Sequence, residues 1–239
     1  MDISLRDAIL CFLFALSGTV GGWALTEKLA GEYAAASFLL IGLVIVLALL
    51  AAEVFLFFLG RRRLIYCVLF NIVFAGGIVW FMLCLLLPML WAPSVRGVEK
   101  IVLFSFLIVL CVDSILKAKR QFQNRWGTET ERALTIHYNV RKGTVDWSRV
   151  LRAMKLTAVL KVPGIPESMT SFISLVMILS MLAGLSLRSI FPVFSLFAWG
   201  VPACLAISIF MQLIGFGAAQ IMKLIELEKR YQTRISPKH

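Results

Sequence analysis

The chain has 239 residues, of which 60% are hydrophobic and only 15% are charged, and its formal net charge is +11. A soluble globular domain cannot bury that share of apolar side chains, so the composition excludes soluble classes and predicts a chain that lies mostly in lipid. The expected fold is an all-α integral membrane protein, a bundle of about six transmembrane helices with both termini cytoplasmic and one basic cytoplasmic loop.

Residues 1–116 are predicted to hold the first four membrane spans. A helix needs roughly 20 predominantly apolar residues to cross the hydrocarbon. The expected spans cover residues 7–25, 35–59, 64–87 and 101–116. The first span contains Gly18 and Gly22 at a spacing that allows another helix to approach closely, so a helix contact is expected there.

The longest polar segment follows, and residues 117–166 are predicted to form a basic cytoplasmic loop. Residues 117–167 carry eleven basic and four acidic side chains. Residues 167–222 are predicted to hold span five, at 167–187, and span six, at 200–222. Pro192, Gly200 and Pro202 interrupt the last apolar run, which predicts an interfacial or re-entrant piece at 190–199. Residues 223–239 form the expected cytoplasmic tail.

The distribution of positive charge supports this topology. Six spans place 20 of the 24 Lys and Arg residues on the cytoplasmic side. This asymmetry is the one that orients membrane proteins. Arg61, Arg62 and Arg63 mark the cytoplasmic turn between spans two and three. The membrane is expected to be a bacterial inner (plasma) membrane, and its anionic inner leaflet is the expected lipid partner.

Two polar side chains are predicted to meet inside the membrane. Glu53 lies eight residues before Arg61, and Asn71 lies eight residues after Arg63. At the rise of an α-helix both lie roughly 12 Å from the cytoplasmic interface. Because the turn between them makes spans two and three neighbours, Glu53 and Asn71 are expected to form a hydrogen bond. The pair serves either as structural glue or as a site that handles a cation or proton.

Two further polar positions occur in predicted spans. Asp113 precedes Lys117 by four residues, which is the spacing of a helical ion pair at the interface. Gln212 lies about two turns before Gln220, and the two glutamines either line a polar seam or contact a neighbouring subunit.

The basic loop is predicted to contain one short amphipathic helix. Asp146 can cap a helix that begins at Trp147. The apolar face of this helix comprises Trp147, Val150, Leu151, Met154 and Ala158. Such a helix can lie on the anionic leaflet, dock on a partner or pack against its own bundle. The predicted partner-facing or lipid-facing basic residues are Arg61, Arg62, Arg63, Arg141, Lys142, Arg149, Arg152 and Lys155.

The sequence contains no motif for catalysis, nucleotide binding or phosphate transfer. There are only two histidines, so no His-based metal site is expected within one chain, and no cofactor is expected. The five cysteines lie in apolar runs without C-x-x-C spacing, which is typical of small buried side chains. Nucleic acid is not expected as a partner, because no recognised motif accompanies the charge.

Two functions fit this pattern. The first is a non-enzymatic inner-membrane subunit that anchors a multi-protein assembly of secretion, conjugation or defence type. It would dock a soluble cytoplasmic protein through the basic loop. The alternative is a homo-oligomeric ion channel or transporter that uses Glu53 and Asn71. The polar groups gather towards the cytoplasmic half of the spans, which favours the first function.

Overall fold

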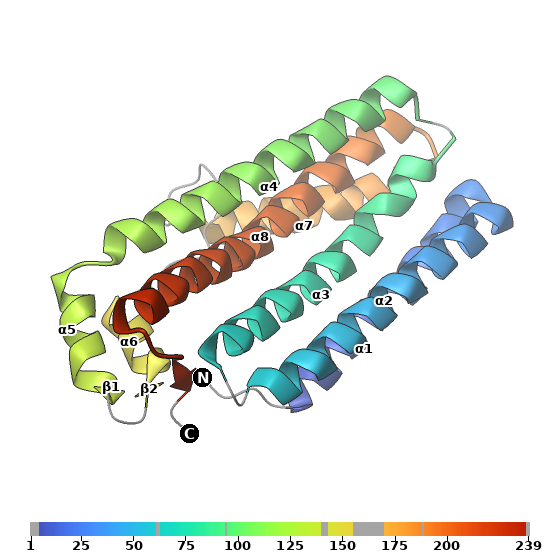
Figure 1. The fold of residues 1–239 in the computed structure, drawn as a ribbon. Coiled ribbons are helices and arrows are strands. Elements are labelled where there is room, and N and C mark those ends of the chain that lie inside the picture. Colours follow the sequence, from blue (N-terminus) through green and yellow to red (C-terminus); the bar gives the residue numbers. More distant parts are fainter. Residues whose placement is uncertain are drawn as a thin grey trace.

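The computed structural model describes residues 5–60, 63–93, 95–139, 143–154, 170–187 and 189–237. The long helices run back and forth along one axis (Figure 1). They are α1 (Leu5–Ala30), α2 (Glu32–Gly60), α3 (Leu64–Trp91), α4 (Gly97–Arg125), α7 (Thr170–Ser186) and α8 (Pro192–Tyr231). The short elements gather at one end of the bundle, where both chain ends also lie. They are α5 (Thr128–His137), β1 (Tyr138–Asn139), β2 (Thr144–Val145), α6 (Trp147–Ala153) and β3 (Ser236–Pro237).

Five of the described helices are long and apolar enough to cross a membrane: α1, α2, α3, α4 and α8. In lipid every backbone polar group must be bonded within its own segment, so long apolar runs form helices. The described part of α7 has 17 residues, or about 25 Å at the rise of an α-helix, slightly less than the hydrocarbon thickness. Large apolar side chains cover the outside of these helices, as expected of surfaces in contact with lipid.

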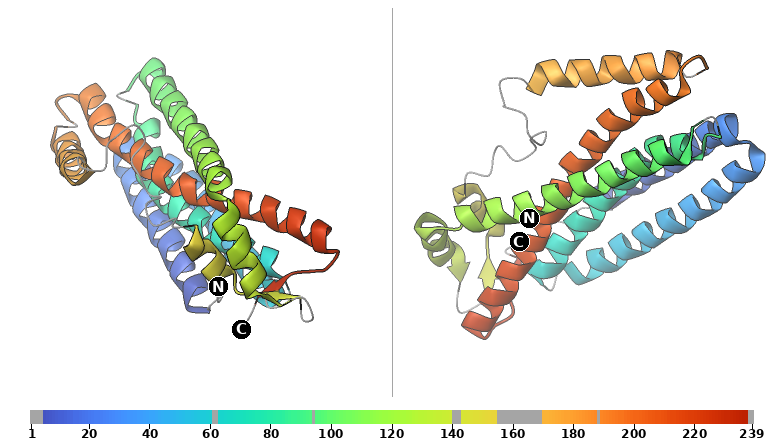
Figure 2. Two further views of the ribbon diagram at one scale, coloured as in Figure 1. Left: turned by 90° about the vertical axis from the view of Figure 1, so that its left-hand side faces the viewer. Right: turned by 90° about the horizontal axis from the view of Figure 1, so that it is seen from above.

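The long helices form two groups that meet along α3 and α8. Helices α1, α2 and α3 pack on one another, while α8 packs against α4, α7 and α3. Figure 2 shows α7 at the outer edge, beside α8. A Cβ atom on Gly18 would lie 2.8 Å from the Cα of Phe81, and one on Gly22 would lie 2.6 Å from the Phe38 ring. The predicted contact face at these two glycines is therefore confirmed.

Helix α8 begins at Pro192 and is continuous over 40 residues, so residues 192–199 belong to the same helix as span six, which corrects the predicted separate interfacial or re-entrant piece at 190–199. Pro202 lies inside α8, and packing from neighbouring helices makes a proline tolerable in an apolar helix. A Cβ on Gly200 would lie 2.5 Å from the Leu103 side chain, so this glycine is a site of close packing with α4 rather than a break. Helix α3 likewise continues through Pro88 and ends at Trp91, not at residue 87.

The short elements and the end of α8 form a folded unit, here named the cap, which comprises α5, β1, β2, α6, β3, the first turn of α3 and the last turns of α8. Its sheet has the order β1-β2-β3, with β1 antiparallel and β3 parallel to β2. The Leu64 backbone N–H donates to the Ile235 carbonyl at 3.0 Å. The loop and the tail thus share one core, which includes Leu64, Leu134, Val145, Trp147, Val150, Leu224, Leu227 and Ile235.

At about 60 Å, α8 is roughly twice as long as the hydrocarbon core is thick. Its apolar part belongs to the bundle, and its last turns supply Leu224 and Leu227 to the core of the cap. The cap is therefore built directly onto an extension of a membrane-length helix, without a flexible connection at α8.

Candidate functional site

Glu53 is the first candidate. Among the residues that the structure describes, it is the only acidic or basic side chain that is fully buried. The Cys11 thiol and the Asp7 carboxylate of α1 are close enough to interact with it electrostatically. Neither carboxylate oxygen of Glu53 has a well-formed hydrogen bond with the described part of the chain. A buried polar group without such partners is unfavourable, so Glu53 needs a functional or structural reason.

Asn71 does not form the predicted pair with Glu53. It lies on the exposed side of α3, and its amide donates to the Cys67 carbonyl of the same helix at 2.7 Å. Glu53 instead faces α1. The spacing along the chain predicted the same membrane depth for both side chains. Depth does not determine how far each helix is rotated about its axis.

The other two intramembrane predictions have different outcomes. The Lys117 ammonium lies 2.7 Å from the Asp113 carboxylate, so the predicted ion pair is confirmed. Gln212 is buried on α8 and therefore faces the interior of the chain rather than a neighbouring subunit. Gln220 has a defined role in the cap, because its side-chain oxygen accepts a hydrogen bond from the Trp147 indole at 2.9 Å.

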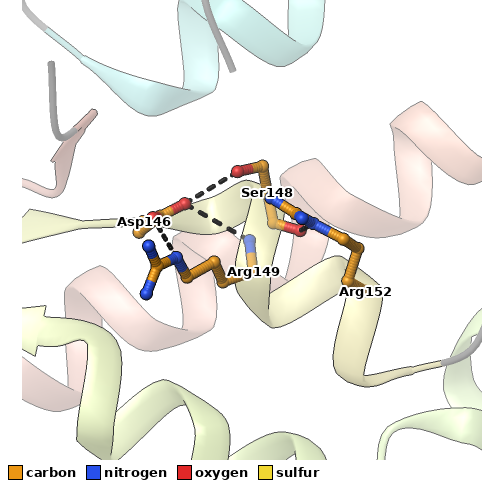
Figure 3. A network of polar contacts seen from close by, with 4 residues as sticks. All are labelled: Asp146, Ser148, Arg149 and Arg152. Carbon is orange, nitrogen blue, oxygen red and sulfur yellow. Dashed lines mark hydrogen bonds and ion pairs between the residues drawn. The ribbon is translucent and has the colours of Figure 1, made fainter.

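Asp146 is the N-cap residue of helix α6, as predicted (Figure 3). The Asp146 carboxylate accepts hydrogen bonds from the Ser148 hydroxyl at 2.7 Å and from the Arg149 backbone N–H at 3.3 Å. The Arg149 guanidinium lies 3.0 Å from the same carboxylate. The Ser148 hydrogen bond is the main cause that lowers the pKa of Asp146 below its ordinary value, and Arg149 adds to it. One turn on, the Arg152 side chain donates to the Ser148 carbonyl at 3.4 Å.

The apolar face of α6 packs against its own protein. Trp147, Val150 and Met154 are buried, and they join cores that contain residues of α4, α5 and α8. Arg149 and Arg152 point away and are exposed. Of the three expected uses of this helix, packing on its own bundle is the one observed. The predicted contributions of Ala158 and Lys155 lie outside the described residues.

The remaining basic candidates differ in position. The Arg63 guanidinium lies 3.7 Å from the Glu228 carboxylate, which also accepts the Ile235 backbone N–H at 3.0 Å. Arg63 therefore helps to tie the start of α3 to the end of α8, a long-range pairing for which the sequence carried no signal. Four predicted residues, Arg61, Arg62, Arg141 and Lys142, lie outside the described residues. Exposed basic side chains on and beside the cap are Arg120, Arg125, Arg132, Arg149, Arg152, Lys229, Arg230 and Arg234.

The sequence did not predict an aromatic cluster where α6 of the cap packs against the end of α4. The rings of Phe122 and Trp126 lie 5.8 Å apart, and those of Trp126 and Trp147 lie 5.9 Å apart. The Lys223 ammonium lies 5.1 Å from the centre of the Trp126 ring. These residues come from α4, the residue after α4, α6 and α8, so only the tertiary packing brings them together.

Within the described ranges, no group of three His, Cys, Asp or Glu residues could hold a metal ion. No protein-family model, curated protein or solved structure matches this chain.

Proposed function

We propose that this protein is a non-enzymatic subunit of a bacterial inner membrane, with six spans and both termini in the cytoplasm. It anchors a multi-protein assembly and docks a soluble cytoplasmic protein on the outer surface of the cap. The observation that carries this proposal is a folded cap with an exposed basic surface, built on an extension of α8.

The internal packing of α6 defines the kind of partner. Since the apolar face of this helix is buried in the cap, the partner meets exposed charged side chains such as Arg149 and Arg152. An acidic surface complements them, and opposite charge raises the rate of association and fixes the orientation of the complex. The partner is therefore an acidic soluble protein rather than an apolar peptide.

Helix α8 gives the docked partner a fixed place. It passes without a break from the apolar bundle into the core of the cap. Arg63 and Glu228 add a second tie between the cap and the start of α3. A partner on the cap is thus held at a constant distance from the bilayer, which is what an anchoring subunit must provide.

The test is a pull-down of the tagged full-length protein in mild detergent, with mass spectrometry and the mass of the complex. The double variant Arg152→Glu, Arg149→Gln should lose a stoichiometric acidic partner. The control, Lys28→Glu with Arg96→Gln, makes the same charge change on exposed residues far from the cap and should keep it. Equal recovery of the partner with both variants would contradict docking on this surface.

Proton or cation transport is a second candidate function, favoured by the buried Glu53. Asn71 is no longer part of this candidate, because its amide is bonded within α3. In reconstituted vesicles, Glu53→Gln should abolish flux while Asp113→Asn, at the exposed ion pair, should leave it unchanged. Unchanged flux with Glu53→Gln would remove Glu53 from any transport pathway.

A further inference from the structure

A pocket with a volume of about 320 Å³ lies between α4 and α8. Its walls include Phe122 and Trp126 on one side and Met222, Lys223 and Glu226 on the other. Pockets for small ligands begin at roughly this size. The pocket belongs neither to the exposed face of α6 nor to the surroundings of Glu53.

The pocket lies where α8 changes from apolar to polar. Lys223 is the first charged residue of α8, and Met222 just before it is 51% exposed. On the facing helix, Phe122 lies beyond the interfacial ion pair of Asp113 and Lys117. The pocket thus has an apolar edge towards the membrane and a charged edge towards water, as a phospholipid has.

The pocket is lined by one cation, one anion and the exposed side chain of Gln123, and the Trp126 ring forms part of its wall. The Lys223 ammonium lies 2.7 Å from the Glu226 carboxylate, and the Lys223 side chain is only 19% exposed, whereas that of Glu226 is 61% exposed. The indole N–H of Trp126 is buried and has no acceptor among the described residues. Because protein atoms cover this nitrogen, the charged groups that a ligand in the pocket can reach are the Lys223 ammonium and the Glu226 carboxylate.

We propose that this pocket binds the headgroup of an aminophospholipid. The phosphate takes the Lys223 ammonium as its donor, and the primary ammonium of the headgroup donates to Glu226. The acyl chains leave past Met222 along the apolar surface of α4 and α8. Charge complementarity selects this ligand: an anionic headgroup is repelled by Glu226, and a choline ammonium has no N–H to donate to it.

The experiment measures lipid binding by native mass spectrometry of the delipidated full-length protein. Phosphatidylethanolamine, phosphatidylcholine and phosphatidylglycerol are titrated with identical acyl chains, and phosphoethanolamine without chains is added as a competitor. One molecule of phosphatidylethanolamine should bind about tenfold more tightly than the other lipids, the effect of one charge-assisted hydrogen bond. Phosphoethanolamine should compete weakly. Equal binding of the three lipids, preference for phosphatidylglycerol, or full competition by phosphoethanolamine would overturn the proposal.

Two variants locate the site. Lys223→Gln and Glu226→Gln should each weaken phosphatidylethanolamine binding about tenfold. The matched control is Asp113→Asn with Lys117→Gln, which removes an ion pair of the same 2.7 Å length that does not line this pocket. Unchanged binding in both pocket variants would contradict the assignment. The rank order of lipids for the unmodified protein tests the proposal independently of how the variants fold.

Discussion

The group of α1, α2 and α3 and the cap are stabilised in different ways. In the helix group, backbones approach closely at small residues such as Gly18 and Gly22, and the carboxylate of Glu53 is buried without a well-formed hydrogen bond. In the cap, apolar side chains form a core, and hydrogen bonds join polar side chains from distant segments. The Trp147 indole donates to Gln220, and the Tyr138 hydroxyl bonds to Thr233 at 2.9 Å.

The difference follows from the solvent around each region. Lipid supplies no hydrophobic driving force between helices, so their association depends on close van der Waals packing. Water drives the burial of apolar side chains in the cap, so a core of large apolar side chains stabilises it.

The largest expected effect is on the cap. Trp147→Ala removes a fully buried side chain and should destabilise the cap by about 3–5 kcal/mol. Trp147→Phe keeps most of the ring and loses the hydrogen bond to Gln220, so its cost should be nearer to about 1 kcal/mol. Limited proteolysis of the purified protein reports opening of the cap. The half-exposed Trp91, replaced by Ala, serves as the control, and equal protease sensitivity of all three variants would refute this account of the cap.

In the group of α1, α2 and α3, the corresponding test adds a Cβ atom at a glycine. A Cβ on Gly18 meets the α3 backbone at Phe81, so Gly18→Ala should destabilise the protein by about 1–3 kcal/mol through overpacking. A Cβ on Gly21 meets nothing within 4 Å, so Gly21→Ala should be neutral or slightly stabilising. Unfolding by denaturant in one detergent, followed by tryptophan fluorescence, measures both. Identical midpoints would show that α1 and α3 do not depend on this contact.

A pair of isosteric substitutions compares the two regions directly. Gln220→Met leaves the Trp147 N–H buried without an acceptor and should cost about 1–3 kcal/mol. Glu53→Met replaces a buried carboxylate that has no well-formed hydrogen bond, so the free energy of unfolding should stay constant or rise. The same unfolding assay shows whether each substitution raises or lowers the free energy of unfolding. A large loss of stability in Glu53→Met would mean that the Glu53 carboxylate has hydrogen bonds as favourable as that of the Gln220 amide.

The smallest effect concerns Asp146 and pH. Its folded pKa lies below the ordinary value of 3.8, so its carboxylate stabilises the cap at all pH values above that point. This contribution is lost as pH falls through the lowered folded pKa. Asp146→Asn should therefore flatten the decrease in cap stability below about pH 4, measured by unfolding at several pH values. At neutral pH, Asp146→Ala should cost about 1 kcal/mol through loss of the helix cap.

Features that depend on one helix or on a few neighbouring residues could be predicted from the amino-acid sequence. The apolar runs predicted the long helices, and Asp146 predicted the start of α6. The spacing of Asp113 and Lys117 predicted their ion pair, and the Gly18 spacing predicted a close helix contact. Each of these follows from helical periodicity or from residue type, which are visible in a short stretch of chain.

The rotation of each helix about its axis and the contacts between distant segments could not be predicted from the sequence, because they depend on tertiary packing. Rotation of the helices separates Asn71 from Glu53, although the sequence spacing predicted the same depth for both. Packing of α4 on Gly200 explains why this glycine does not mark a break in α8. The backbone bond from Leu64 to Ile235 joins the start of α3 to the C-terminal segment. These features depend on contacts between residues far apart in sequence, which local periodicity does not encode.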